Sequence, residues 1–333
     1  MKVLMEISYV GSEFCGWQVQ RNALSVQKTV QTAAETLLKS PCAVTGCSRT
    51  DAGVHARQYF CTLENENLDR FPLDRLPLAL NCLLPETVGV RDAFPVEKDF
   101  HPRYRALGKE YEYLIHGGRL KNPFLSERAF FCGRMPDTDC MQREAQDLVG
   151  THDFSSFCAS GGKAEDKTRT VYFCRVEKLP GEQVSLRICA DGFLYNMVRI
   201  IAGTLLECGL DGRKSCGTVL SLKDRRFAGR TLPAQGLYLD RVFYRKEDLE
   251  MRIAEVNGKY GKSVSQVLDS EKSEWTVLNL PGAVGQLPLS KNGSARRKAV
   301  EKSCPDFRNS GQKGAACGFQ ETGKRRKGYH RKE

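Results

Sequence analysis

Residues 43–63 read AVTGCSRTDAGVHARQYFCTL, in which two β-prone segments flank a polar loop that contains glycine. Residues 43–45 and 58–63 are short segments enriched in β-branched, aromatic and other apolar side chains, which favours strands. The residues between them carry too many polar side chains and glycines to belong to a hydrophobic core. The stretch therefore predicts two strands joined by a loop whose side chains are available for chemistry.

This loop contains a carboxylate, Asp51, two residues after Arg49. A neighbouring guanidinium favours the ionised form of a carboxylate, which leaves it available as an anionic nucleophile or base. Gly53 permits a backbone conformation closed to other residues, and Thr50 and His55 can supply hydrogen bonds that fix the loop. The alternative interpretation is an Asx turn with a solvated salt bridge, and the residue types alone do not decide between the two.

The segments around the loop predict a mixture of strands and amphipathic helices. Strand patterns cover residues 2–9, 109–115, 171–176, 184–188 and 242–244, and helical patterns cover residues 26–37, 73–84, 137–149 and 193–208. Ser25 is placed to cap the first helix, and Gly209 and Gly212 to end the last one. A strand, a glycine turn and an amphipathic helix occur in both halves, which indicates either an internal duplication or the ordinary arrangement of an α+β fold.

The charge of the chain favours a polyanionic partner, of which nucleic acid is the usual example. The 333 residues carry 51 Lys and Arg against 40 Asp and Glu, a net charge of +11. Residues 1–250 have a net charge of only +2, and residues 251–333 one of +9. The hydrophobic fraction of 41% is sufficient for a packed core, and no apolar stretch approaches the about 18 residues of a membrane span.

The cysteine pattern indicates buried thiols in a reducing compartment. None of the 14 cysteines has Cys-x-x-Cys spacing, and no Cys/His cluster has the spacing of a zinc finger. We therefore predict neither a metal site nor a disulfide framework. The first residues do not read as a signal peptide because Glu6 interrupts the apolar run, and we expect a cytoplasmic protein with no membrane association.

The loop around Asp51 closely resembles the signature GRTDAGVH of the tRNA pseudouridine synthase A family, with Ser48 in place of the first glycine. Other segments resemble further motifs of that family in the expected order, and these are residues 9–18, 25–27, 100–106, 109–113, 152–157, 196–205 and 234–239. The resemblance covers residues 1–246. The remainder of the chain has no counterpart in the pattern.

The resemblance implies an α+β fold of two similar domains, each an antiparallel sheet with helices on one face, around a central basic cleft. The N-terminal domain with the catalytic loop would cover residues 1–106 and the C-terminal domain residues 107–246. It also implies a homodimer in which one tRNA contacts both subunits. We interpret residues 247–333 as a basic, mostly disordered tail, because periodicity fades there and the chain ends in a polybasic stretch.

The activity implied by the resemblance is the isomerisation of uridine to pseudouridine in the anticodon stem-loop of tRNA, at positions 38, 39 and 40, without a cofactor. By resemblance, Asp51 is the catalytic nucleophile or base, Arg199 its ion-pair partner and Tyr111 the tyrosine that contacts the target base. Arg199 also lies close to the apolar face of its helix, where an unpaired charge is costly. Tyr113 shares a strand face with Tyr111, so periodicity alone does not distinguish these two tyrosines.

The RNA contacts follow from the same resemblance. Arg49 is expected to take the place of the target nucleotide when it is flipped out of the stack. The remaining expected RNA-binding residues are His101, Arg103, Tyr104, Arg105, Lys163, Lys167 and Arg169. The alternatives are a solvated basic loop at residues 101–105, a non-catalytic tRNA-binding protein on the same fold, and an RNA-associated adaptor that acts through residues 251–333.

Overall fold

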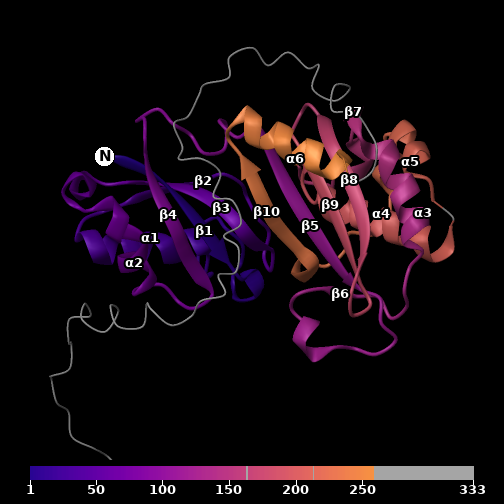
Figure 1. The fold of residues 1–333 in the computed structure, drawn as a ribbon, viewed down its shortest axis with the longest axis horizontal. Helices are drawn as coiled ribbons and strands as arrows, with labels where there is room; N and C mark the ends of the chain where they lie inside the picture. The colour runs from indigo at the N-terminus through magenta and orange to yellow at the C-terminus, as the bar shows by residue number, and fades with distance from the viewer. Residues whose placement is uncertain (163, 213, 259–333) are drawn as a thin grey trace, which may run out of the picture. The chain divides into compact units, whose positions relative to one another are not determined.

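The computed structural model describes residues 1–162, 164–212 and 214–258 (Figure 1). Ten strands in this part of the chain form one mixed sheet in the order β4-β1-β3-β10-β5-β9-β8-β7, with β2 paired to β3 and β6 to β5. The strands are β1 (Lys2–Tyr9), β2 (Ala43–Gly46), β3 (His55–Glu64), β4 (Val88–Val96), β5 (Gly108–His116), β6 (Phe130–Phe131), β7 (Gly150–Asp153), β8 (Thr168–Leu179), β9 (Gln183–Ala190) and β10 (Leu237–Phe243). The α-helices are α1 (Val26–Leu38), α2 (Leu76–Asn81), α3 (Thr138–Ala145), α4 (Met197–Asp211), α5 (Cys216–Leu222) and α6 (Lys246–Gly258).

The first strand and helix form as their sequence predicts. Strand β1 lies between β3 and β4 and is antiparallel to both, so most of its side chains are buried on both faces of the sheet. Ser25 caps α1 with its hydroxyl, which accepts a hydrogen bond from the backbone N–H of Lys28 at 3.4 Å. The buried face of α1 contains Val26, Val30 and Leu38, and this face joins the main hydrophobic core.

The sheet is continuous from the first half of the chain to the second. Strands β1–β4 and β5–β10 meet where β10 returns along the chain to lie beside β3, with Tyr238 opposite His55 and Leu239 opposite Ala56. This pairing and that of β5 with β6 are parallel, whereas an antiparallel arrangement was predicted. A parallel neighbour requires a distant return of the chain, which local sequence patterns do not reveal. The division into two domains at residue 106 and the basic cleft stay predictions.

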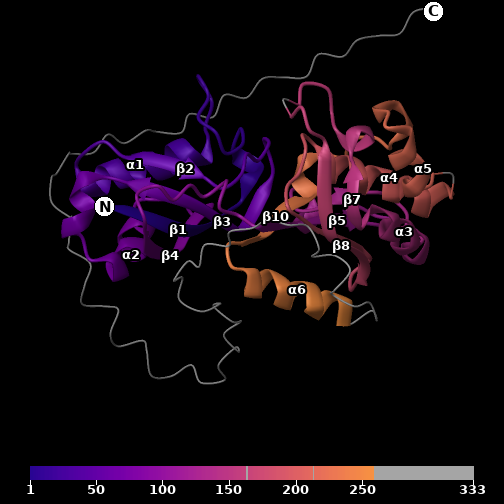
Figure 2. The ribbon, with the colours of Figure 1, turned by 90° about the horizontal axis from the view of Figure 1, so that it is seen from above.

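Helix α6 corrects two predictions. Residues 247–258, which we interpreted as the start of a disordered tail, belong to a helix that packs on the sheet (Figure 2). Its buried residues Leu249, Ile253 and Val256 cover Phe173 and other side chains in a second, smaller hydrophobic cluster.

The placement of α6 also shows that the helices do not all cover one face. On β8, Phe173 faces α6, whereas its neighbour Cys174 belongs to the main core, which also contains the apolar side of α4. The prediction of helices on one face is therefore wrong for α6. The rest of the predicted tail, 259–333, lies outside the described residues. Within the described part of the chain, no helix is both long enough and apolar enough to cross a membrane.

Candidate active site

The loop that carries Asp51 connects β2 to β3 and rests on the segment that follows β1. The backbone N–H of Trp17 donates to the carbonyl of Thr50 at 3.1 Å, and that of Gly53 to the carbonyl of Phe14 at 3.2 Å. At Gly11, a Cβ atom would lie 2.0 Å from the carbonyl oxygen of Val54, so only glycine permits this approach. Two motifs that are distant in the sequence are thus one structural unit.

His55 fixes the base of this loop as a neutral imidazole. Its Nδ1 accepts the backbone N–H of Gly11 at 3.0 Å, so the ring proton lies on Nε2 and is donated to the carbonyl of Gln235 at 3.1 Å. The ring is 1% exposed and stacks on Tyr238 with 4.6 Å between centroids. Burial lowers the pKa of His55, which agrees with its neutral form. The predicted role of His55 and Thr50 in fixing the loop is confirmed, since the Thr50 hydroxyl shares a hydrogen bond with Tyr9 at 2.8 Å.

Asp51 and Arg199 form the predicted ion pair. Nη1 of Arg199 donates to Oδ2 of Asp51 at 3.1 Å, although the two residues are 148 positions apart. The same guanidinium donates to the carbonyl of Leu232 at 2.7 Å and to the side chain of Asn196 at 2.8 Å, so its orientation is fixed by the protein. The side chain of Asp51 is 37% exposed and that of Arg199 17%. The arrangement therefore offers solvent or a substrate an oriented carboxylate.

Tyr111, rather than Tyr113, lies beside this loop. Its hydroxyl shares a hydrogen bond with that of Ser48 at 3.2 Å, and its ring packs edge-on against Phe193 with 5.0 Å between centroids. Burial raises the pKa of Tyr111, and the hydrogen bond from Ser48 opposes that rise. Tyr113 is fully buried, and its hydroxyl donates to the carbonyl of Pro233 at 2.6 Å. The structure thus separates two tyrosines that strand periodicity left equivalent.

Lys109 is a neighbour of the loop that sequence reasoning missed. It lies on the same face of β5 as Tyr111, and its Nζ donates to the carbonyl of Cys47 at 2.8 Å. Burial lowers the pKa of Lys109, and the positive charge of Arg103 lowers it further. Lys109 therefore holds the loop that carries Asp51 against β5.

The remaining predicted RNA-binding residues lie on exposed segments. Arg49 is exposed, and among the described residues Asp51 pairs with Arg199 rather than with Arg49. Tyr104 is 76% exposed, and its ring lies 4.3 Å from that of His101 and 5.9 Å from the guanidinium of Arg103.

Other basic residues are held differently. Arg105 forms an exposed ion pair with Asp99 at 3.3 Å. Lys167 and Arg169 lie at the start of β8, where Arg169 donates to the carbonyls of Asp166 and Thr168 and packs near Gly192. Gly192 directly precedes Phe193, so Arg169 is brought close to the segment that contacts Tyr111. Lys163 lies outside the described residues.

Three further residues of the site were not predicted as functional, namely Ser48, Phe193 and Asn196. Asn196 belongs to a motif segment, but only its left-handed backbone (φ 59°) before α4 shows why its side chain reaches Arg199. Ser48 was noted as a departure from the family signature, and its contact with Tyr111 joins the loop to β5, which is distant in the sequence. Tertiary contacts of this kind leave no periodic signal.

The sequence of this chain matches those of known proteins. A family model described as tRNA pseudouridine synthase matches residues 145–245. The tRNA pseudouridine synthase A of Acetivibrio thermocellus is 40% identical over 245 residues, which cover 73% of this chain and 99% of the relative. The enzymes of the same name from Ruminiclostridium cellulolyticum and Lysinibacillus sphaericus are 39% and 42% identical, over 73% and 72% of this chain and 99% and 97% of their own lengths.

Among solved structures, the crystal structure of the archaeal box H/ACA sRNP Nop10-Cbf5 complex matches with a TM-score of 0.32 and 13% identity, over 71% of this chain and 46% of that one. So low a TM-score supports no conclusion. The curated relatives, in contrast, are matched almost from end to end at about 40% identity. The chain belongs to the tRNA pseudouridine synthase A family of isomerases.

Proposed function

We propose that this protein converts uridine to pseudouridine in the anticodon stem-loop of tRNA, at positions 38, 39 and 40, with Asp51 as the nucleophile or base. The observation that carries the proposal is the partly exposed carboxylate of Asp51, held by Arg199 within a loop that matches the family signature. The names of the relatives, which are tRNA pseudouridine synthases, support the substrate class.

The chemistry explains why an oriented anion is useful. The bond between N1 of uracil and the ribose breaks, the base turns, and a bond between C5 and the same ribose carbon forms, so a proton leaves C5 and one is gained at N1. No oxidation or net hydrolysis occurs, and the reaction balances without a cofactor. Because Arg199 binds Oδ2 of Asp51, the other carboxylate oxygen is directed to the substrate. Arg199 thus positions the carboxylate.

Tyr111 contacts the target base in this proposal. Since burial raises the pKa of Tyr111, its hydroxyl stays protonated at neutral pH and can donate a hydrogen bond. Its ring can stack on the target base. Phe193 and Ser48 hold the ring and the hydroxyl. A fixed aromatic ring beside the carboxylate would keep the detached base from diffusing away before it rejoins the ribose.

The exposed basic residues supply RNA binding. Flipping a base out of its stack costs a few kcal/mol, which Arg49 offsets by taking the vacated place. The segment with Arg103 and Tyr104 contacts the RNA backbone together with His101 and Arg105, as do Lys163, Lys167 and Arg169 from the second half. We further propose two domains around a basic cleft, a homodimer that binds one tRNA with both subunits, and action in the cytoplasm, all of which rest on family resemblance.

Mapping of pseudouridine in tRNA tests the proposal. tRNA from a strain that lacks the gene should lack pseudouridine at positions 38–40, and expression of the wild-type chain should restore it. Asp51→Asn should not restore it and should still bind tRNA, whereas Asp74→Asn, at an exposed position, should behave as wild type. Restoration by Asp51→Asn would exclude Asp51 as the catalytic group. Normal tRNA in the deletion strain would favour the alternative of a tRNA-binding protein without chemistry.

A further inference from the structure

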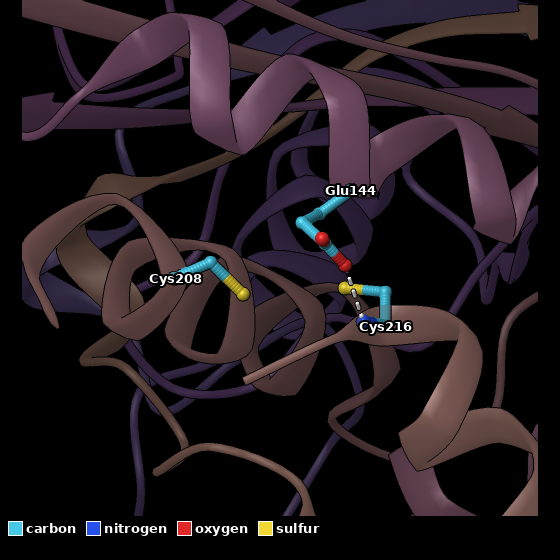
Figure 3. A group of neighbouring side chains, drawn as sticks. All are labelled: Glu144, Cys208 and Cys216. Atoms are coloured by element: carbon cyan, nitrogen blue, oxygen red, sulfur yellow. Dashed lines mark hydrogen bonds between the residues drawn. The ribbon is translucent and has the colours of Figure 1, made fainter. Parts of the chain in front are cut away.

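Three side chains with metal-binding atoms converge at the junction of α3, α4 and α5. Glu144 comes from the last turn of α3, Cys208 from the last part of α4, and Cys216 is the first residue of α5. A carboxylate oxygen of Glu144 and the two Sγ atoms all lie within 4.8 Å of one another. Figure 3 shows the thiol of Cys208 pointing towards that of Cys216, with the carboxylate of Glu144 directed at the same point.

The spacing of the three atoms suits a metal ion. Zn–S and Zn–O bonds of about 2.0–2.3 Å place neighbouring ligand atoms about 3.3–3.8 Å apart. Because the three atoms lie within 4.8 Å of one another, they need to approach by at most about 1.5 Å, which side-chain rotation can supply. Two thiolates and one carboxylate form a donor set that suits zinc better than magnesium or calcium, which prefer oxygen ligands alone.

The protein already holds the three groups at this point. The thiol of Cys208 donates to the backbone carbonyl of Lys214 at 2.7 Å. Glu144 accepts the backbone N–H of Cys216 at 2.8 Å and so is already held at the junction. The nearby ammonium of Lys214 is directed elsewhere, to Glu207 at 3.0 Å and to two backbone carbonyls. A divalent ion would neutralise thiolates and a carboxylate that are otherwise costly to bury.

We propose that Glu144, Cys208 and Cys216 bind one Zn²⁺ ion that fixes α3, α4 and α5 to one another. A water molecule completes the coordination. The site is structural rather than catalytic, because Cys208 lies nine residues beyond Arg199 on α4, or about 13 Å along the helix axis. It therefore differs from the function proposed above and does not depend on it.

This inference revises the prediction of no metal site, which rested on the spacing of cysteines. The two cysteines are eight residues apart, and the glutamate precedes the first by 64 residues, so no compact motif marks the set. A disulfide between Cys208 and Cys216 is the competing use of these thiols. It would leave the carboxylate of Glu144 without a part in the cluster, and it would need an oxidant.

Zinc content of the full-length chain tests the proposal. Protein purified in the presence of Zn²⁺ and dialysed against metal-free buffer should retain about one Zn²⁺ per chain by elemental analysis. The zinc content of the double variant Cys208→Ser/Cys216→Ser should be at least about fivefold lower than that of wild type. Glu144→Gln, which keeps an acceptor for the N–H of Cys216, should weaken Zn²⁺ binding at least about tenfold. Cys82→Ser, at an exposed thiol outside the cluster, should retain wild-type zinc.

A second readout covers the case in which a variant folds poorly. Added Zn²⁺ should raise the melting temperature of metal-depleted wild type, and Co²⁺ should give a thiolate charge-transfer absorption. Equal zinc in wild type and the double variant would overturn the proposal. So would an intact mass of the isolated protein that is two hydrogens lower because Cys208 and Cys216 are joined.

Discussion

Arg199 meets Asp51 through one hydrogen bond of 3.1 Å in a partly open loop, whereas Arg252 holds Glu110 through two hydrogen bonds of 2.7 and 2.9 Å beneath α6. The side chains of the first pair are 17% and 37% exposed, and those of the second 7% and 0%. Both are arginine–carboxylate pairs between segments that are far apart in the sequence. They differ in what remains accessible once the pair has formed.

An accessible carboxylate can react with a substrate, whereas an enclosed carboxylate can only stabilise the fold. The carboxylate of Glu110 is enclosed, and its two oxygens are both used by Arg252. Asp51 keeps exposed surface after it binds Arg199. Arg252 of the buried pair lies in α6, which begins just after the family-model match ends at residue 245. Glu110 and Tyr111 are neighbours on β5 and face opposite sides of the sheet, so one strand serves both purposes.

Breaking the Arg199–Asp51 pair should have the largest effect, and the quantity that changes should be the rate of turnover. Arg199→Met removes the group that orients Asp51, so we expect single-turnover pseudouridine formation to fall about 10²–10³-fold. The free energy of unfolding, measured by urea denaturation with fluorescence detection, should change much less. Arg226→Met, which removes an exposed pair with Asp224, is the matched control and should be near wild type. A wild-type rate for Arg199→Met would mean that the pair is structural only.

Breaking the buried Arg252–Glu110 pair should lower stability and leave turnover unchanged. Arg252→Met leaves the buried carboxylate of Glu110 with only the part-exposed Arg241 at 4.0 Å, so the free energy of unfolding should fall by about 3 kcal/mol. Turnover per folded molecule should be unchanged. The double variant Glu110→Gln/Arg252→Met should recover most of the loss, because no isolated charge remains. Arg245→Met, at a more exposed pair with Asp248, should cost less than about 1 kcal/mol. A slower reaction in folded Arg252→Met would show that α6 also positions Tyr111.

The free energy of unfolding should depend on pH through His55, whose imidazole lies beneath the Asp51 loop. Burial lowers the pKa of His55 in the folded protein below its unfolded value of about 6.5, so between these two values the unfolded state binds more protons. The stability that depends on neutral His55 is therefore complete above about pH 6.5 and is lost as the pH falls towards the folded pKa. Urea unfolding should show a smaller decrease on acidification for His55→Gln than for wild type. Parallel pH profiles would show that His55 is not the titrating group.

The smallest effect is expected at the departure from the family signature. Ser48→Gly restores the family residue and removes one hydrogen bond to the hydroxyl of Tyr111, a loss of about 0.5–1.5 kcal/mol. Turnover should change by less than about tenfold, and Ser48→Ala should resemble Ser48→Gly. A loss as large as that of Arg199→Met would place Ser48 in the reaction itself. Steady-state kcat and KM on one tRNA transcript measure the difference.

Local patterns predicted the local elements well. The alternation of residues 2–9 gave β1, and Ser25 caps α1 as its position indicated. Helix α4 was predicted from residue 193 but begins at Met197, because Asn196 adopts a left-handed conformation that the apolar pattern does not encode. Helix α6 was missed because six charged residues conceal the spacing of Leu249, Ile253 and Val256.

The site could be predicted only as far as its motifs reach. Asp51 and Arg199 were paired by family resemblance, and their ion pair is present. The contact of Ser48 with Tyr111 and the convergence of Glu144 with Cys208 depend on how distant strands and helices pack. Such contacts are set by the tertiary fold, and a single sequence does not display them.

The return of β10 to the side of β3 has a consequence for how the chain is made. Tyr238 pairs with His55, so a ribosome must add 183 residues after His55 before the ring that stacks on it exists. At about 5–20 residues per second this takes on the order of 10–40 s. Contacts so far apart in sequence slow folding, and until they form, part of one edge of β3 stays open to other chains. The loop that carries Asp51 therefore gains its last packing partners only late in synthesis.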